Sequence, residues 1–128
     1  MGVIQLKRAY EPAARTDGRR VLVERLWPRG IRKAELVLDD WLKDVAPSTE
    51  LRKWFGHDPA RWTEFRKRYF DELKASPAVD AVRVLVALAA KGTLTLVFSS
   101  HDLEHNNAVA LKAHLERRAR PSKARTSK

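Results

Sequence analysis

The residues from Val21 to Gly30 read Val-Leu-Val-Glu-Arg-Leu-Trp-Pro-Arg-Gly. The first half is β-branched and aliphatic, which is typical of a strand that is covered on both faces. Pro28 fixes its own φ and Gly30 can adopt a positive φ, so the chain should leave the strand in a stiff turn. Core packing does not require the two arginines of this turn, Arg25 and Arg29. The stretch therefore predicts a buried strand followed by a binding site.

The rest of the chain has the size and composition of one domain. The sequence has 128 residues, 44% of them hydrophobic, which is enough for a single core. No apolar run reaches the roughly 18 residues of a membrane span, and the amino terminus is charged too early for a signal peptide, so we expect a cytoplasmic protein without a membrane partner. The chain has no cysteine, which excludes disulfides, thiolate nucleophiles and Cys-based metal sites.

The net charge is +10, from 26 basic against 16 acidic residues. Six of the basic residues lie in residues 117–128, which contain no acidic residue, so residues 1–116 carry only +4. We expect one α/β domain over residues 1–116 and a disordered basic tail over residues 117–128. A solubilising tail is the simpler interpretation, and weak non-specific binding of nucleic acid through the tail is the alternative.

Apolar runs predict strands at residues 3–7, 20–26 and 93–99. Helices are expected at about residues 38–45, 48–55, 58–73, 76–91 and 104–118 from the spacing of apolar side chains and from Ser, Asp, Pro and Gly at their ends. The fold class is thus α/β, with a small, mostly parallel sheet of about three strands flanked by about five helices. The direction of the first strand relative to the second stays open, because a parallel crossover usually needs a dozen or more residues.

Polar residues follow each expected strand, and in parallel sheets ligands bind beyond the carboxyl ends of the strands. In chain order these residues are Lys7, Arg8, Tyr10, Glu24, Arg25, Trp27, Arg29, Ser99, Ser100, His101 and Asp102, with Asn106 and Asn107 on the first turn of the last helix. Guanidinium forks, hydroxyls and a helix amino terminus favour a phosphate or carboxylate ligand. In the structural alternative, Arg25 and Arg29 pair with Glu24, Asp39 or Asp102 and only lock the bend.

The segment from His101 to His105 matches the zinc motif H-x-x-E-H. The match straddles a strand end instead of lying within a helix, and only Glu116 follows as a further carboxylate, so no metal is predicted. Ser99 and Ser100 beside His101 would permit a nucleophile, but adjacent residues rarely face one another. The chain has no glycine-rich phosphate loop, and we predict no cofactor.

Several blocks resemble a known family. They are Val21 to Gly30, Trp41 to Ser48, Leu51 to Phe55, Asp102, and His105 to Ala108. Together they closely resemble the short, YeaO-like branch of the DUF488 family, from the first strand to about Leu115. The resemblance implies a compact α/β domain of bacteria and archaea and no established activity. The matching positions implied for a common site are Arg25, Trp27, Arg29, Ser48, Arg52, Asp102 and Asn107.

The chain also departs from the family's pattern. Glu24 stands where the family usually has aspartate, and Ser99, Ser100 and His101 stand where it often has a small pair and a lysine. A longer branch carries Cys-His-Arg near His105, so cysteine chemistry of that kind cannot apply to this chain.

Three functions remain open from the sequence. The first is binding, or conversion by an enzyme, of a small anion such as a nucleotide or sugar phosphate. Its ligand-binding candidates are Arg25, Trp27, Arg29, Ser48, Arg52, Ser100 and Asn107, and its candidate general bases are Glu24 and Asp102. The second is an accessory protein that binds nucleic acid through the tail and basic helices, with Arg52, Lys53, Arg61, Arg66, Lys67 and Arg68. The third is a non-catalytic interaction module in which the arginines are structural.

Overall fold

The computed structural model describes residues 3–119. In the labels below, η marks a 3-10 helix. The elements in chain order are β1 (Ile4–Arg8), η1 (Arg15–Asp17), β2 (Arg19–Leu22), β3 (Asp40–Trp41), η2 (Lys43–Val45), α1 (Thr49–Phe55), η3 (Pro59–Arg61), α2 (Trp62–Leu73), α3 (Ala78–Lys91), β4 (Leu94–Phe98) and α4 (Asn107–Ala119).

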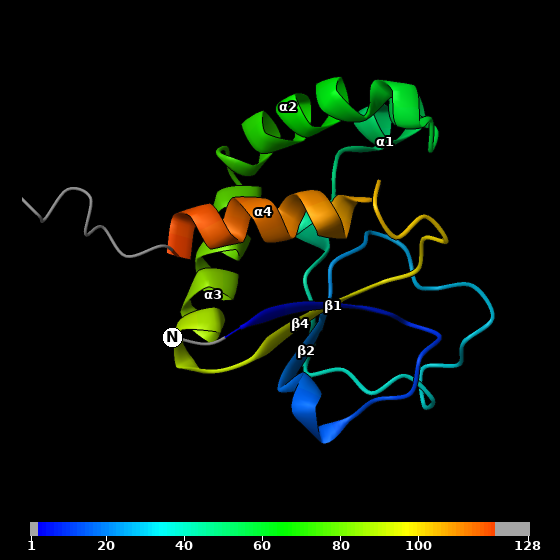
Figure 1. Ribbon diagram of the computed structural model, residues 1–128, viewed down its shortest axis with the longest axis vertical. Coiled ribbons are helices and arrows are strands. Elements are labelled where there is room, and N and C mark those ends of the chain that lie inside the picture. Colours follow the sequence, from blue (N-terminus) through cyan, green and yellow to red (C-terminus); the bar gives the residue numbers. More distant parts are fainter. Residues whose placement is uncertain (1–2, 120–128) are drawn as a thin grey trace, which may run out of the picture.

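The last strand of the chain, β4, lies inside the sheet, whose order is β1-β4-β2-β3 (Figure 1). All three pairings are parallel, and Leu96 of β4 is matched with Leu6 of β1 on one side and Val21 of β2 on the other. The predicted small, parallel α/β sheet is therefore confirmed. The direction of β1 is settled as well, because β1 and β2 each run parallel to β4 instead of pairing with each other.

The helix expected over residues 38–45 is wrong. Asp40–Trp41 forms the edge strand β3 and Lys43–Val45 forms η2. The backbone N–H of Leu42 donates to the carbonyl of Leu22 at 3.0 Å. A hydrogen bond to a distant strand has replaced the local helical bond, and helical spacing in a short apolar run cannot reveal this competition. The described part of the chain thus has four α-helices instead of about five.

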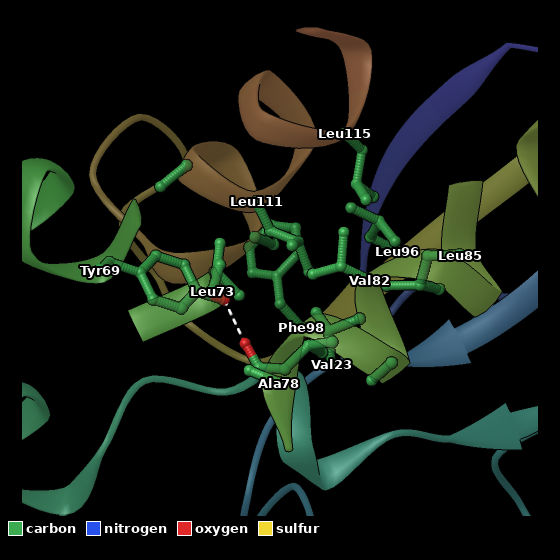
Figure 2. Close-up of a cluster of buried hydrophobic side chains, with 14 of the residues drawn as sticks. Val23, Tyr69, Leu73, Ala78, Val82, Leu85, Leu96, Phe98, Leu111 and Leu115 are labelled. Carbon is green, nitrogen blue, oxygen red and sulfur yellow. Dashed lines mark hydrogen bonds between the residues drawn. The ribbon is translucent and has the colours of Figure 1, made fainter. Parts of the chain in front are cut away.

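All four α-helices lie on one side of the sheet, and loops cover the other side (Figure 1). Helices α3 and α4 pack against the strands, whereas α2 packs on α4 and α1 packs on α2. Because side chains alternate along a strand, Val21 and Leu96 enter the helical core, whereas Leu22 and Val97 point to the second face, here called the loop face. Figure 2 shows the helical core, to which Val23, Tyr69, Leu73, Ala78, Val82, Leu85, Leu96, Phe98, Leu111 and Leu115 belong. Each fully buried large apolar side chain in this core contributes about 1.5–3 kcal/mol.

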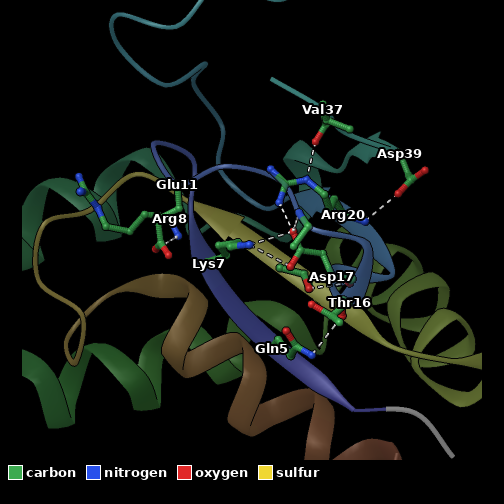
Figure 3. A network of polar contacts seen from close by, with 11 residues as sticks. Gln5, Lys7, Arg8, Glu11, Thr16, Asp17, Arg20, Val37 and Asp39 are labelled. Atoms are coloured by element: carbon green, nitrogen blue, oxygen red, sulfur yellow. Dashed lines mark hydrogen bonds and ion pairs between the residues drawn. The ribbon is translucent and has the colours of Figure 1, made fainter. Parts of the chain in front are cut away.

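A buried ion triad joins β1 to β2 on the loop face (Figure 3). Asp17 is 2% exposed and accepts hydrogen bonds from Lys7 Nζ at 3.0 Å and from Arg20 Nη1 at 2.6 Å. Burial raises the pKa of Asp17, but the hydrogen bonds from the Ala14 N–H, Lys7 and Arg20 outweigh it, so the pKa lies below its ordinary value. The triad is satisfied internally.

Helix α4 continues to Ala119, into the segment that the sequence assigned to the basic tail. Residues 120–128 make up the rest of that tail and lie outside the described residues. The disorder expected for these residues stays a prediction. No helix between residues 3 and 119 is long and apolar enough to cross a membrane.

His114 of α4 should make the stability of the fold depend on pH. Its side chain is buried, and its Nε2 has no hydrogen-bond partner. Burial, with the nearby charges of Arg118, Arg117 and Lys74, lowers the pKa of His114 from 6.5 to about 4. Below pH 6.5 the unfolded chain takes up a proton before the folded chain does, so stability falls as the pH drops toward 4.

The variant His114→Phe keeps an aromatic ring beside Phe70, on which His114 stacks at 5.6 Å. We expect the wild type to lose about 2–3 kcal/mol more than this variant between pH 7.5 and pH 4, from the linkage of the shifted pKa. Urea unfolding at a series of pH values measures the difference. If the free energy of unfolding falls equally with pH in the two proteins, His114 becomes protonated in the folded state without cost.

Candidate functional site

A pocket of about 550 Å³ lies where the bend after β2, the end of α1 and the β4–α4 loop meet. Its volume falls within the range of small-molecule pockets, roughly 300–1,000 Å³. The lining residues are Glu24, Arg25, Leu26, Trp27, Arg29, Ala46, Pro47, Arg52, Phe55, His57, Phe65, Ser99, Ser100, His101, Asp102, Asn106 and Asn107. The lining therefore includes all the ligand-binding and general-base candidates named from the sequence except Ser48.

The residues expected at the end of the first strand do not line this pocket. Lys7 belongs to the triad on the loop face. Arg8 donates from Nε to the carbonyl of Ser100 at 2.9 Å and from Nη2 to that of Ser99 at 3.0 Å. The Tyr10 hydroxyl donates to the carbonyl of Arg29 at 2.9 Å. Arg8 thus holds the β4–α4 loop, and Tyr10 holds the bend after β2, without lining the pocket.

Three arginines, Arg25, Arg29 and Arg52, supply the positive charge of the pocket. Among the described residues, none of the three has a carboxylate oxygen within 4.0 Å. Arg25 makes one long contact, from Nη2 to the carbonyl of Ala46 at 3.5 Å. Its Nε is buried and has no hydrogen-bond partner. The side chains of Arg29 and Arg52 are exposed and form no hydrogen bond within residues 3–119.

The carboxylates that the structural alternative assigned to these arginines bind elsewhere. Glu24 bonds to Ser99, and Asp39 accepts the backbone N–H of Arg20 at 2.8 Å. Asp102 bonds within its own loop. The described side chains therefore hold the bend by other contacts, without an ion pair to Arg25 or Arg29.

Glu24 fastens the bend after β2 to the end of β4. Its Oε2 accepts the backbone N–H of Ser99 at 3.0 Å, and its Oε1 accepts the Ser99 hydroxyl at 2.8 Å. Both oxygens of this candidate general base are thus occupied by structural hydrogen bonds.

The variant Glu24→Ala should therefore destabilise the fold by about 2 kcal/mol, since the part-buried Ser99 N–H would lose its acceptor. Glu104→Ala is the matched control, because Glu104 is an exposed acid of the β4–α4 loop whose carboxylate forms no hydrogen bond in the described structure. Chemical denaturation of both variants tests this prediction. A loss in Glu24→Ala as small as that in the control would contradict the structural role.

Asp102 closes the turn before α4. Its Oδ1 accepts the backbone N–H groups of Glu104 and His105, each at 2.9 Å, and its Oδ2 lies 3.0 Å from His105 Nδ1. The Glu104 N–H, followed by the contacts with His105, holds the pKa of Asp102 below its usual range. A carboxylate with a lowered pKa is a poorer general base near neutral pH.

Asn106 and Asn107 connect the start of α4 to the site. Asn106 caps the helix, because its Oδ1 accepts the Val109 N–H at 2.9 Å. This cap explains why α4 begins at Asn107 instead of near residue 104. Asn107 Nδ2 donates to the carbonyl of Val23 at 2.9 Å, directly beyond β2. The amino end of α4 is thereby held against the pocket.

The remaining nominated residues have structural contacts. Trp27 donates from Nε1 to the Ile31 carbonyl at 2.6 Å and meets Trp41 edge to face at 5.3 Å. Ser100 Oγ accepts the N–H of Asp102 at 3.1 Å. Trp27 and Ser100 thus shape the walls.

Ser48 lies outside the pocket. Its Oγ caps α1 by accepting the Leu51 N–H at 3.1 Å and donates to Glu72 Oε2 at 2.6 Å. The partner Glu72 is 24 residues away along the chain, so the sequence could not identify this link.

Sequence reasoning missed the apolar part of the pocket. Phe55 and Phe65 stack at 4.4 Å, and their spacing in the sequence marked them only as core. His57 has a positive φ of 59°, directly after Gly56 at 53°, and lies 6.3 Å from Phe55 between ring centroids. The Gly-His pair after a short helix was the one local signal for this wall. Leu26, on the bend after β2, also lines the pocket and is 64% exposed.

Three of the six basic residues of α1, η3 and α2 lie over aromatic rings, namely Arg61, Arg66 and Arg68. The guanidinium of Arg68 lies 4.4 Å from the ring of Trp54 and pairs with Glu64 at 2.8 Å. Arg61 lies 5.1 Å from the same ring and pairs with Asp58 at 3.7 Å. This helical surface is thus partly neutralised by its own acids.

The residues of the H-x-x-E-H segment have other partners. His101 Nδ1 lies 3.4 Å from Arg8 Nη2, and His105 contacts Asp102. Within residues 3–119, no three histidine, aspartate or glutamate side chains are placed to hold a metal ion.

Several bacterial proteins are similar to this chain over most of its length. The chain is 46% identical over 108 residues to the uncharacterized protein YeaO of Escherichia coli K12. The aligned residues cover 84% of this chain and 92% of YeaO. The chain is 41% identical over 108 residues to the uncharacterized protein Rv3073c of Mycobacterium tuberculosis H37Rv, covering 84% and 89% of the two chains. No solved structure matches this chain. A family model described as the inactive DUF488-N3 subclade matches residues 3–128, so the chain belongs to the DUF488 family, in its YeaO-like branch.

Proposed function

We propose that this protein binds a small anion, bearing a phosphate or a carboxylate, in the pocket beyond β2 and β4. One observation carries the proposal: Arg25, Arg29 and Arg52 all line the pocket, and none of them has a carboxylate oxygen within 4.0 Å among the described residues. An oxyanion in the pocket would supply the missing negative charge and would accept hydrogen bonds from the accessible guanidinium nitrogens.

The surroundings of Arg25 support an anion over a neutral ligand. Arg29 and Arg52 add two guanidinium groups that no described carboxylate neutralises. The start of α4 also borders the pocket through Asn107, and the amino end of a helix favours negative charge. Guanidinium groups match phosphate and carboxylate by paired hydrogen bonds.

The proposed role is binding without turnover. Glu24 and Asp102, the candidate general bases, are both occupied by structural hydrogen bonds. The description of the matching family model as inactive agrees with this assignment.

The test is calorimetric titration of the wild-type chain with inorganic phosphate, together with thermal unfolding in phosphate. We expect phosphate to raise the melting temperature of the wild type, because a ligand at 100 times its Kd stabilises the folded state by about 2.7 kcal/mol. The variants Arg25→Gln and Arg29→Gln should bind phosphate at least about tenfold more weakly, a loss of about 1.4 kcal/mol.

Arg19→Gln is the matched control. It removes the same charge from an exposed arginine at the start of β2, which does not line the pocket. This control should keep the phosphate affinity of the wild type. Absence of phosphate binding to the wild type, or an equal loss in the control, would overturn the proposal.

A further inference from the structure

We infer that the anion carries an aromatic or apolar body, in place of the hydroxyl-rich body of a sugar phosphate. This inference deepens the proposed function and rests on it. Of the two ligand classes that the sequence left open, it favours the one with a flat ring system.

The first ground is that Glu24, Ser100 and the Asn107 Nδ2 are already committed to hydrogen bonds within the protein. Glu24 uses both carboxylate oxygens for Ser99. Ser100 bonds to the Asp102 backbone, and Asn107 donates to the Val23 carbonyl. A sugar ring needs donors and acceptors for each of its hydroxyls, and a buried hydroxyl without a partner opposes binding. The uncommitted donors are concentrated on the arginines, which suit the anionic head.

The second ground is the apolar wall on the α1 and α2 side. Phe55 and Phe65 line the pocket from this side, although they are only 5% and 1% exposed, and the exposed residue His57 lies close to Phe55 in the chain. Leu26, on the bend after β2, adds an exposed apolar side chain to the lining. His57 is the non-glycine residue with a positive φ in the described chain, and such conformations gather at ligand sites. Leu26 is 64% exposed, so its side chain is accessible to a ligand in the pocket.

The third ground is size. The pocket of about 550 Å³ is far larger than a bare phosphate, so a phosphate held by Arg25 would fill only part of it. Burial of an apolar ring in the remaining space would be favourable in proportion to the area removed from water.

The experiment compares three anions by calorimetric titration of the full chain: phenyl phosphate, glucose 6-phosphate and inorganic phosphate. The first two are phosphate monoesters with the same head group and differ in the body. Phenyl phosphate should bind at least about tenfold more tightly than inorganic phosphate, which is 1.4 kcal/mol. Glucose 6-phosphate should bind no more tightly than inorganic phosphate.

A matched pair of variants locates the effect. Leu26→Ser should lower the affinity for phenyl phosphate several-fold and leave the affinity for inorganic phosphate unchanged. Leu103→Ser is the control, since Leu103 is 60% exposed and does not line the pocket. Both side chains are exposed, so neither change should prevent folding.

The outcomes separate the two proposals. If inorganic phosphate binds and requires Arg25 but phenyl phosphate binds no more tightly, the inference on the body is wrong and anion binding stands. Tighter binding of glucose 6-phosphate than of phenyl phosphate also overturns the inference alone. If none of the three anions binds, the proposed function falls as well. A preference for phenyl phosphate that Leu26→Ser weakens, and Leu103→Ser does not, supports both.

Discussion

Replacing Asp17 with asparagine should lower the free energy of unfolding by about 3–5 kcal/mol near neutral pH. The change preserves the shape of the side chain but removes the charge that neutralises Lys7 and Arg20. The Arg20 side chain is only 4% exposed, so it would remain as a buried cation without a counter-charge. Urea denaturation with linear extrapolation measures this loss.

The control for Asp17 is Glu35→Gln. Glu35 also pairs with an arginine, Arg32, but their side chains are 53% and 87% exposed, and a pair of this kind contributes at most about 1 kcal/mol. The pKa of Asp17 is lowered in the folded state. Its contribution is therefore present above the unfolded pKa of about 3.9 and is lost as the pH falls through the folded pKa. A loss in Asp17→Asn no larger than the control's would mean that water reaches the triad.

The second large effect is expected for Gly18→Ala, at about 3 kcal/mol or more. Gly18 has a φ of 62° and a ψ of −133°, a combination that residues other than glycine avoid. A Cβ there would collide with the carbonyl oxygen of Thr93 and lie 2.8 Å from the Thr93 Cβ. That carbonyl also accepts the Arg19 N–H at 3.0 Å, so it cannot move away without breaking the pairing of β2 with β4.

Two other glycines separate the causes of this effect. Gly30 has a φ of 82° with no atom near its missing Cβ, so Gly30→Ala should cost only the backbone term of about 1–2 kcal/mol. Gly92 has an extended backbone and open space, and Gly92→Ala should be close to neutral. Thermal unfolding of the three variants ranks them. Equal losses in Gly18→Ala and Gly30→Ala would show that the contact with Thr93 adds nothing.

These two sites explain how the loop face supports the pocket. Asp17 and Gly18 hold the start of β2 against β1 and β4, and the same strand ends in the bend that carries Arg25. The position of the pocket therefore depends on the register of β2 with β4, which Asp17 and Gly18 set at the start of β2.

The residues of the pocket can be predicted from the sequence to a useful extent. Parallel strands gather their carboxyl ends at one edge, so the positions of Arg25, Arg29 and Asp102 after their strands are enough to place them together. The partners of these residues could not be predicted. The sequence nominates Glu24 as a general base, and its actual role depends on Ser99, which is 75 residues away along the chain.

Local patterns of residues are enough to predict the three main strands, the four α-helices and the parallel α/β class, because apolar periodicity and end signals act over a few residues. Residues 38–45 were predicted wrongly because the backbone of Leu42 bonds to Leu22, and no local signal records that competition. The same reason applies to the pocket. The unpaired Arg25 Nε and the wall of Phe55 and Phe65 arise from contacts between segments far apart in the chain, where packing and hydrogen bonding leave some groups satisfied and others free.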